Sequence, residues 1–178
     1  MAQQIATFGG GCFWCIEAAF NAIKGVESAI SGYCGGSEQT ANYKAVCSGL
    51  TEHAEVVQVT FDDTQTSFQA LLTFFFSLHD PTQLNRQGND VGRQYRSVIF
   101  YHDDKQKRLA EQAISEFELG DVFFDPIVTE LAAIQPFYPA EDYHQHYFVG
   151  HQQEPYCALV IAPKLSKFRQ RYEYALKS

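Results

Sequence analysis

The sequence predicts an α/β (α+β) protein, a two-layer sandwich with a ferredoxin-like split βαβ core and an extended C-terminal segment. Three observations lead to this fold class. β-Branched runs and segments with helical apolar spacing follow one another as strand, helix, strand, strand, helix, strand, which is the split βαβ order. The 178 residues suffice for one buried core, and 46% hydrophobic with 19% charged residues is typical of globular proteins. No repeat, linker or low-complexity tract divides the chain, so we expect one domain over residues 1–178.

The N-terminal part of the chain supplies the first strand, the first helix and the second strand. Residues 3–8 read as a short strand that ends in three consecutive glycines. Apolar residues then recur at helical spacing over residues 13–24, and Gly25 is placed to end that helix. Residues 26–33 are strand-like and run into a glycine pair.

The middle of the chain supplies the third strand, the second helix, the fourth strand and a further helix. Residues 54–61 are a β-branched run bounded by two aspartates that favour a turn. Residues 68–78 form an apolar helix that stops before Pro81. Residues 95–101 read as a strand, and residues 103–118 as a helix that begins with aspartate.

The C-terminal third predicts the extended segment beyond this core. It contains a strand near residues 127–133, a polar aromatic segment around residues 138–148 and a helix that starts near Lys164. These elements add to the core and do not suggest a second domain.

Charge and composition exclude several classes of function. A net charge of −8 argues against binding nucleic acid or an anionic membrane, because both need clustered lysine and arginine. The first residues lack the basic start and apolar core of a signal peptide, and no apolar stretch is long enough to span a bilayer. We therefore expect a cytoplasmic protein. Its five unevenly spaced cysteines suit catalytic, redox or buried thiols better than a disulfide framework.

Cys12 stands where the glycine run opens into the first helix. Backbone N–H groups are unpaired at a helix start and the helix dipole is positive there, so a thiolate is favoured. Such a position lowers the pKa of a cysteine and makes its sulfur nucleophilic at neutral pH. Cys15 lies one turn deeper in the helix, so the helix start lowers the pKa of its thiol less. The sequence therefore predicts that Cys12 is a reactive thiolate and that the protein is an enzyme.

Three other interpretations of this segment are weaker. A glycine loop before a helix suits phosphate, but neither Gly-Lys-Ser/Thr nor GxGxxG is present. A zinc site would need His144 and His146 beside Cys12 and Cys15, because the chain has no second CxxC pair. A thioredoxin-like motif would need a different order of elements. We therefore expect no metal at this site.

Several segments, taken together and in order, resemble the A-type peptide methionine sulfoxide reductase family over roughly 140 residues. They are GCFWC at 11–15, GYCGG at 32–36, NYKAVCSG at 42–49, HAE at 53–55, HDPTQLNRQGNDVGRQYRS at 79–97 and the YHQ-containing stretch at 138–145. Two residues depart from the family's pattern, Cys34 within GYCGG and Glu52 before HAE. Neither removes a residue that the chemistry needs, but whether Cys34 has a redox role or only packs stays open.

The resemblance implies how a sulfoxide would be reduced, which requires a nucleophile for its sulfur and a proton for its oxygen. Cys12 would attack the sulfur, and Glu55 would donate the proton if apolar burial raises its pKa. Tyr43 and Tyr95 would hydrogen-bond the sulfoxide oxygen, since a phenol stays protonated at neutral pH. Asp90 would help to position the substrate.

The same resemblance implies an apolar wall made of Phe13 and Trp14 for the methyl group of the substrate. Sulfur packs favourably against aromatic rings, and the shape of such a wall discriminates the two sulfoxide epimers. A-type enzymes take the S epimer, which is therefore the expected substrate, free or within proteins.

Attack leaves Cys12 as a sulfenic acid, which a second thiol converts into a disulfide. Cys157 resembles the C-terminal resolving cysteine of many relatives, and a mobile stretch that contains a proline would bring it to Cys12. Cys15 is the second choice, because a CxxC disulfide at a helix start is feasible. Thioredoxin is the expected reductant, no cofactor is needed, and we expect a monomer.

Functions of other classes remain open at this point. A binding module for oxidised peptides would use the aromatic pocket without a nucleophile. A structural zinc domain would use the CxxC pair. An acyl-transfer enzyme would pair Cys12 with a histidine base, for which His53 is available, although a proton-donating glutamate suits sulfoxide chemistry better.

Overall fold

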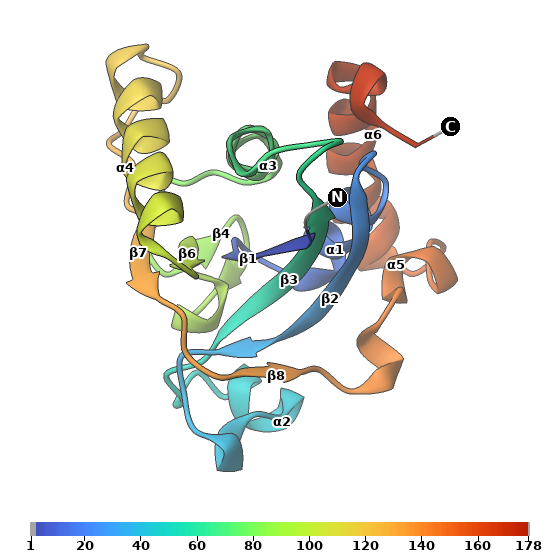
Figure 1. Ribbon diagram of the computed structural model, residues 1–178. Coiled ribbons are helices and arrows are strands. Elements are labelled where there is room, and N and C mark those ends of the chain that lie inside the picture. Colours follow the sequence, from blue (N-terminus) through green and yellow to red (C-terminus); the bar gives the residue numbers. More distant parts are fainter. Residues whose placement is uncertain (1–2, 178) are drawn as a thin grey trace.

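The computed structural model describes residues 3–177, which form a curled six-stranded sheet with helices packed against it (Figure 1). The strands lie in the order β7-β6-β1-β3-β2-β8, and all neighbours are antiparallel except β6 and β7. Their bounds are Gln3–Gly9 (β1), Val26–Cys34 (β2), Ala54–Asp62 (β3), Val98–Tyr101 (β6), Glu130–Ala133 (β7) and Phe137–Pro139 (β8). A separate small hairpin consists of Arg86–Gln87 (β4) and Asp90–Val91 (β5).

The four central strands confirm the predicted ferredoxin-like core. Helix α1 (Phe13–Asn21) connects β1 to β2, with β3 lying between these two strands. Helix α3 (Phe68–Leu78) connects β3 to β6, with β1 between them. These are the two interlocked split βαβ units that the order of predicted elements indicates.

A short connection between the two edges of the sheet explains its curl. Strands β7 and β8 lie at opposite edges, yet only residues 134–136 separate them in the sequence. An extended chain spans about 3.5 Å per residue, whereas six flat strands would place their edges roughly 24 Å apart. The sheet therefore has to curl so that this segment can cross from one edge to the other (Figure 1).

Alternation along β3 separates a large core from a small one. Val57, Val59 and Phe61 belong to the large cluster beneath the helices, in which Phe8 stacks on Phe75 at 4.9 Å between ring centroids. The residues on the other face of the strand belong to a smaller cluster. It comprises Cys34, Ala54, Val56, Val98 and Phe100, with the edge-crossing segment packed on it.

Further helices surround the core. They are α2 (Tyr43–Cys47), α4 (Asp104–Leu119), α5 (Tyr147–Gly150), a π-helical turn (Cys157–Ile161) and α6 (Ala162–Arg171). Helix α6 packs on α1 and α3, so the C-terminal segment closes over the core. None of the helices in the described part of the chain is long and apolar enough to cross a membrane.

The structure corrects several predicted boundaries. The helix predicted over residues 13–24 ends at Asn21, and Gly25 follows in a left-handed turn with φ of +90°. The strand predicted over residues 95–101 begins only at Val98, because the chain before it forms a short 3₁₀ turn. The stretch around Cys157, which we expected to be mobile, is helical instead and leads directly into α6.

Candidate active site

The glycine loop between β1 and α1 fixes the position of Cys12. Gly11 adopts a φ of +90°, a conformation that other residues rarely take, and a Cβ atom there would lie 2.8 Å from Gln87. Its N–H donates to the carbonyl of Tyr95 at 3.2 Å. Cys12 follows as the N-cap of α1 with extended backbone, and its carbonyl accepts from the N–H of Cys15 at 3.3 Å. The sulfur therefore stands at the start of the helix, as predicted.

Glu55 lies on the face of β3 that α1 covers, directly beside this helix start. Its side chain is only 2% exposed, and its Oε1 accepts from the backbone N–H of Phe13 at 3.2 Å. Burial raises the pKa of Glu55 to about 8, with a smaller contribution from the negative charge of Asp90. The carboxyl group is therefore protonated at neutral pH, which is the form that can donate a proton.

The pKa of Cys12 shifts in the direction opposite to the one that the sequence predicts. Although part of the residue reaches solvent, the atoms packed around its sulfur raise the pKa of the thiol, and the charge of Glu55 adds to the effect. The helix start contributes only a weaker opposing hydrogen bond from the N–H of Trp14. Cys12 is therefore a thiol in this state, because desolvation outweighs the helix terminus.

Tyr43 and Tyr95 approach the same place from two short helical turns. Burial raises the pKa of both phenols, and the nearby Glu55 raises them further, so both remain proton donors. Tyr43 begins α2, where the side chain of Asn42 caps the helix by accepting from Ala45 N–H at 2.9 Å.

Asp90 lies in the β4–β5 hairpin and is engaged by a residue that the sequence did not single out. The hydroxyl of Tyr156 donates to Asp90 Oδ2 at 2.5 Å, and burial together with the nearby Cys12 and Asp90 raises the pKa of this phenol. Tyr156, Cys12 and Asp90 line one cavity of about 410 Å³, together with Leu159 and Lys164. Its position just before Cys157 was the only indication of Tyr156 in the sequence.

The two aromatic residues predicted as a wall differ in exposure. Phe13 is 1% exposed and packs against Tyr33, with ring centroids 5.7 Å apart. Trp14 is half-buried and stacks on Tyr147 at 3.8 Å between centroids, with the planes 12° apart. Of the two, only Trp14 therefore has a ring that reaches the surface in this state, whereas Phe13 lies in the core.

Neither candidate for the second thiol is exposed. Cys157 is fully buried in the π-helical turn, next to Tyr156, which lines the same cavity as Cys12. Cys15 is 4% exposed, and burial raises the pKa of its thiol to about 11. Cys34 is fully buried in the small core and its sulfur donates to the carbonyl of Gln135, which fits a packing role.

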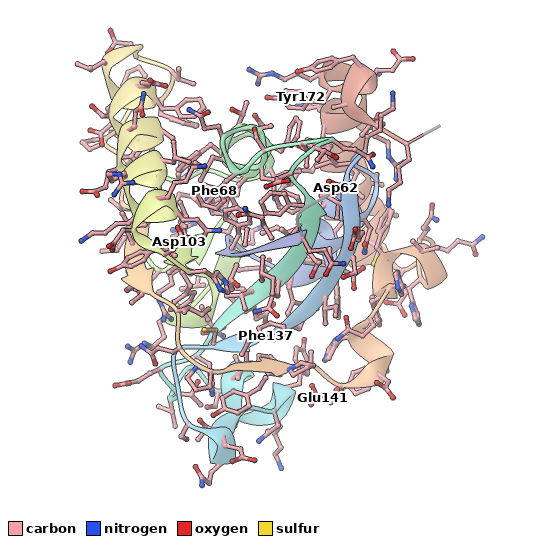
Figure 2. The ribbon with its side chains drawn as sticks, in the orientation of Figure 1. Asp62, Phe68, Asp103, Phe137, Glu141 and Tyr172 are labelled. Atoms are coloured by element: carbon pink, nitrogen blue, oxygen red, sulfur yellow. The ribbon has the colours of Figure 1, made fainter. Side chains whose placement is uncertain are left out.

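The segment after β8 contains further residues whose roles the sequence did not predict. Glu141, labelled in Figure 2, accepts from the hydroxyl of Tyr33 at 2.8 Å and from the N–H of Tyr43 at 2.9 Å. Gln145 bonds both the N–H and the carbonyl of Ser31 in β2. Only the YHQ motif marked this segment in the sequence. Within residues 3–177 no three His, Cys, Asp or Glu side chains are placed to hold a metal ion.

Comparison with known proteins shows which family this chain resembles over nearly its whole length. The family model described as "Peptide methionine sulfoxide reductase" matches residues 4–176. A peptide methionine sulfoxide reductase from Polynucleobacter asymbioticus is 51% identical, over 94% of this chain and 88% of its own.

Two solved structures extend the similarity. Reduced Mxr1 from Saccharomyces cerevisiae superimposes with a TM-score of 0.79 at 34% identity, covering 87% of this chain and 89% of Mxr1. Mxr1 in complex with Trx2 matches with a TM-score of 0.56 at 25% identity, over 82% and 84% of the chains. With a family match over nearly its whole length, this chain belongs to the peptide methionine sulfoxide reductase family.

Proposed function

We propose that this protein reduces methionine-S-sulfoxide, free or within proteins, to methionine, with Cys12 as the nucleophile and thioredoxin as the reductant. The observation that carries the proposal is the buried carboxyl of Glu55, held by the N–H of Phe13 beside Cys12. Its pKa of about 8 keeps a proton available where a sulfoxide oxygen would need one. A module that only binds oxidised peptides would need neither this acid nor a thiol, and family membership supports an oxidoreductase.

The reaction transfers one oxygen atom from the substrate to Cys12. The sulfur of Cys12 attacks the sulfoxide sulfur while Glu55 protonates the oxygen. The S–O bond of the substrate breaks as the oxygen passes to Cys12, and methionine leaves. The proton lost by the Cys12 thiol restores the Glu55 carboxyl, so the products are methionine and a Cys12 sulfenic acid.

The surrounding side chains orient the substrate for this step. The phenols of Tyr43 and Tyr95 donate hydrogen bonds to the sulfoxide oxygen, since both keep their protons. Trp14 packs against the S-methyl group, and the buried Phe13 contributes to the apolar surroundings of the site. Asp90 becomes available to the substrate when Tyr156 moves away, because Tyr156 occupies its Oδ2 here.

Cys157 then attacks the sulfenic sulfur, and water leaves as the Cys12–Cys157 disulfide forms. Its neighbour Tyr156 lines the same cavity as Cys12, so the segment of Cys157 lies beside the nucleophile, and the family resemblance favours Cys157 over Cys15. A dithiol reductant returns both cysteines to thiols, and the complex of the relative Mxr1 with Trx2 supports thioredoxin in this role. We place the enzyme in the reducing cytoplasm, as a monomer without metal or cofactor.

Replacing the nucleophile tests the proposal directly. We expect Cys12→Ser to abolish reduction of the S epimer of a blocked methionine sulfoxide, because serine is a far weaker nucleophile at neutral pH. Cys34→Ser is the matched control, since it removes a buried thiol in the small core and should leave the rate unchanged. Activity that survives Cys12→Ser, or equal wild-type rates on both epimers, would contradict the assignment.

A further inference from the structure

The indole of Trp14 is held from two sides by the segment that follows β8. Its Nε1–H donates to Nδ1 of His144 at 3.0 Å, and its ring stacks on Tyr147. His144 is 1% exposed, whereas Trp14 is only half-buried. A buried side chain therefore fixes the orientation of a ring that reaches the surface beside Cys12.

The hydrogen bond also defines the state of His144. An indole N–H is only a donor, so Nδ1 has to be the acceptor and the neutral ring carries its proton on Nε2. Burial lowers the pKa of His144, which favours this neutral form. Nε2 has no hydrogen-bond partner among the described residues, and Oε1 of Glu141 is 4.0 Å away. A buried N–H without a partner costs stability, so packing alone does not explain a histidine here.

The ring of His144 also contacts other residues that we assign to the substrate. Its centroid lies 5.2 Å from that of Phe13 and 4.3 Å from that of Tyr43. The same turn, Asp142–His144, follows Glu141, which holds the N–H of Tyr43. One short segment thus touches both the apolar wall and a residue that would bind the sulfoxide oxygen.

We propose that His144 is a positioning residue that sets the plane of Trp14 and thereby the affinity of the site for the sulfoxide's methyl group. This inference rests on the proposed function. It assigns His144 no contact with the substrate and no proton transfer. Its effect passes through Trp14, so it depends on the acceptor at Nδ1 and on the presence of the indole.

Two amide variants of His144 test whether the hydrogen-bond acceptor at Nδ1 matters, as opposed to the size of the side chain. The amide oxygen of His144→Asn falls near the position of Nδ1, whereas that of His144→Gln falls near Nε2. We expect His144→Gln to raise KM for the S-sulfoxide roughly 3- to 10-fold, the value of one hydrogen bond, with kcat changed less. His144→Asn should restore most of the wild-type KM. Equal KM values in both variants would overturn the proposal.

A second measurement needs no substrate. Trp14 is the only tryptophan of the chain, so emission excited at 295 nm reports this ring alone. We expect His144→Gln to shift that emission and to increase its quenching by acrylamide, with His144→Asn close to wild type. Unchanged emission in His144→Gln would overturn the role of His144 even if the enzyme is active. If instead the emission changes but the wild type reduces no sulfoxide, the proposed function fails and the positioning of Trp14 stands.

A double-mutant comparison excludes a general loss of stability. In a Trp14→Phe background His144→Gln should raise KM no further, because the ring it positions has lost its donor. Phe168→Ala provides the stability control. Phe168 of α6 packs on Phe74 of α3 and on Tyr172 just after α6, so its truncation should lower the unfolding midpoint without changing KM. An undiminished effect of His144→Gln in the Trp14→Phe background would contradict the proposal.

Discussion

At the scale of single residues, Glu55 combines a stability cost with a chemical purpose. Its carboxyl is buried, accepts one hydrogen bond from Phe13 N–H, and has a pKa of about 8 against 4.5 when unperturbed. Between these two values the unfolded chain releases a proton that the folded chain retains. Wild-type stability therefore falls as the pH rises from 4.5 to 8, while the acid needed for proton donation persists through neutral pH.

We expect Glu55→Gln to be more stable than the wild type at pH 7 while its reductase activity is lost. The gain should be ~3 kcal/mol, because the unfolded carboxyl ionises above its pKa at about 1.4 kcal/mol per pH unit. The amide oxygen keeps the bond from Phe13 N–H, and the variant cannot ionise. Urea unfolding at pH 4.5 and pH 7 measures the effect, which should disappear at the lower pH. The exposed Glu111→Gln is the control, and a gain that is equal at both pH values would argue against a buried neutral Glu55.

Motifs predicted which residues the structure brings together, but not their electrostatic environment. Glu55 and Asp90 both raise the pKa of Cys12 and of Tyr95, and Glu55 raises that of Tyr43, as expected from residues of one site. The sequence places Cys12 at a helix start, which lowers a thiol's pKa, but the burial that raises it depends on segments far along the chain. The hydrogen bonds of Tyr156 to Asp90 and of Trp14 to His144 were not predicted for the same reason, because each joins residues more than 60 positions apart in the sequence.

At the scale of secondary-structure elements, the periodicity of apolar residues predicted the long strands and helices but not the short ones. Helix α3 has the predicted bounds and β1, β2 and β3 each extend one residue beyond theirs, because long apolar patterns specify them locally. The short elements depend on partners instead. Strand β8 pairs with β2, and α2 is anchored by the bond from Tyr43 N–H to Glu141. No sequence pattern predicts the π-helical turn either. Such turns are frequent at functional sites.

This π-helical turn has to open if Cys157 resolves the sulfenic acid, because its sulfur is fully buried here. We expect Cys157→Ser to permit one stoichiometric reduction of sulfoxide and to abolish turnover supported by thioredoxin. Single-turnover and steady-state assays measure the two quantities, and Cys34→Ser is the control. In the wild type, amide exchange over residues 151–161 should rise when the disulfide forms. Full thioredoxin turnover in Cys157→Ser would assign the role to Cys15.

At the scale of the whole molecule, the order of elements predicted the central sheet but not its closure. Two split βαβ units determine the order β6-β1-β3-β2, which the structure confirms. The two edge strands, β7 and β8, depend on the short connection at residues 134–136, and the closed shape depends on the C-terminal segment folding back over the core. That segment reaches back to the turn after α1, where Lys24 N–H donates to the carbonyl of Ala175 at 2.8 Å. Such long-range contacts have no local pattern in the sequence.

The sequence predicts one domain over residues 1–178; these contacts within residues 3–177 support that prediction, and cooperative unfolding tests it. Phe168 of α6 is 4% exposed and packs edge-on against Phe74 of α3, with ring centroids 5.9 Å apart. Phe168→Ala should therefore lower the free energy of unfolding by about 3–5 kcal/mol, the usual cost of truncating a buried phenylalanine. Because α6 also packs on α1, we expect this loss of stability to affect the environment of Trp14 in α1 as well. We expect urea transitions followed by Trp14 fluorescence and by far-UV circular dichroism to coincide, both in the wild type and at the lower midpoint of the variant. If the variant shifted only the dichroism transition, the C-terminal segment would unfold separately, and the single-domain assignment would be wrong.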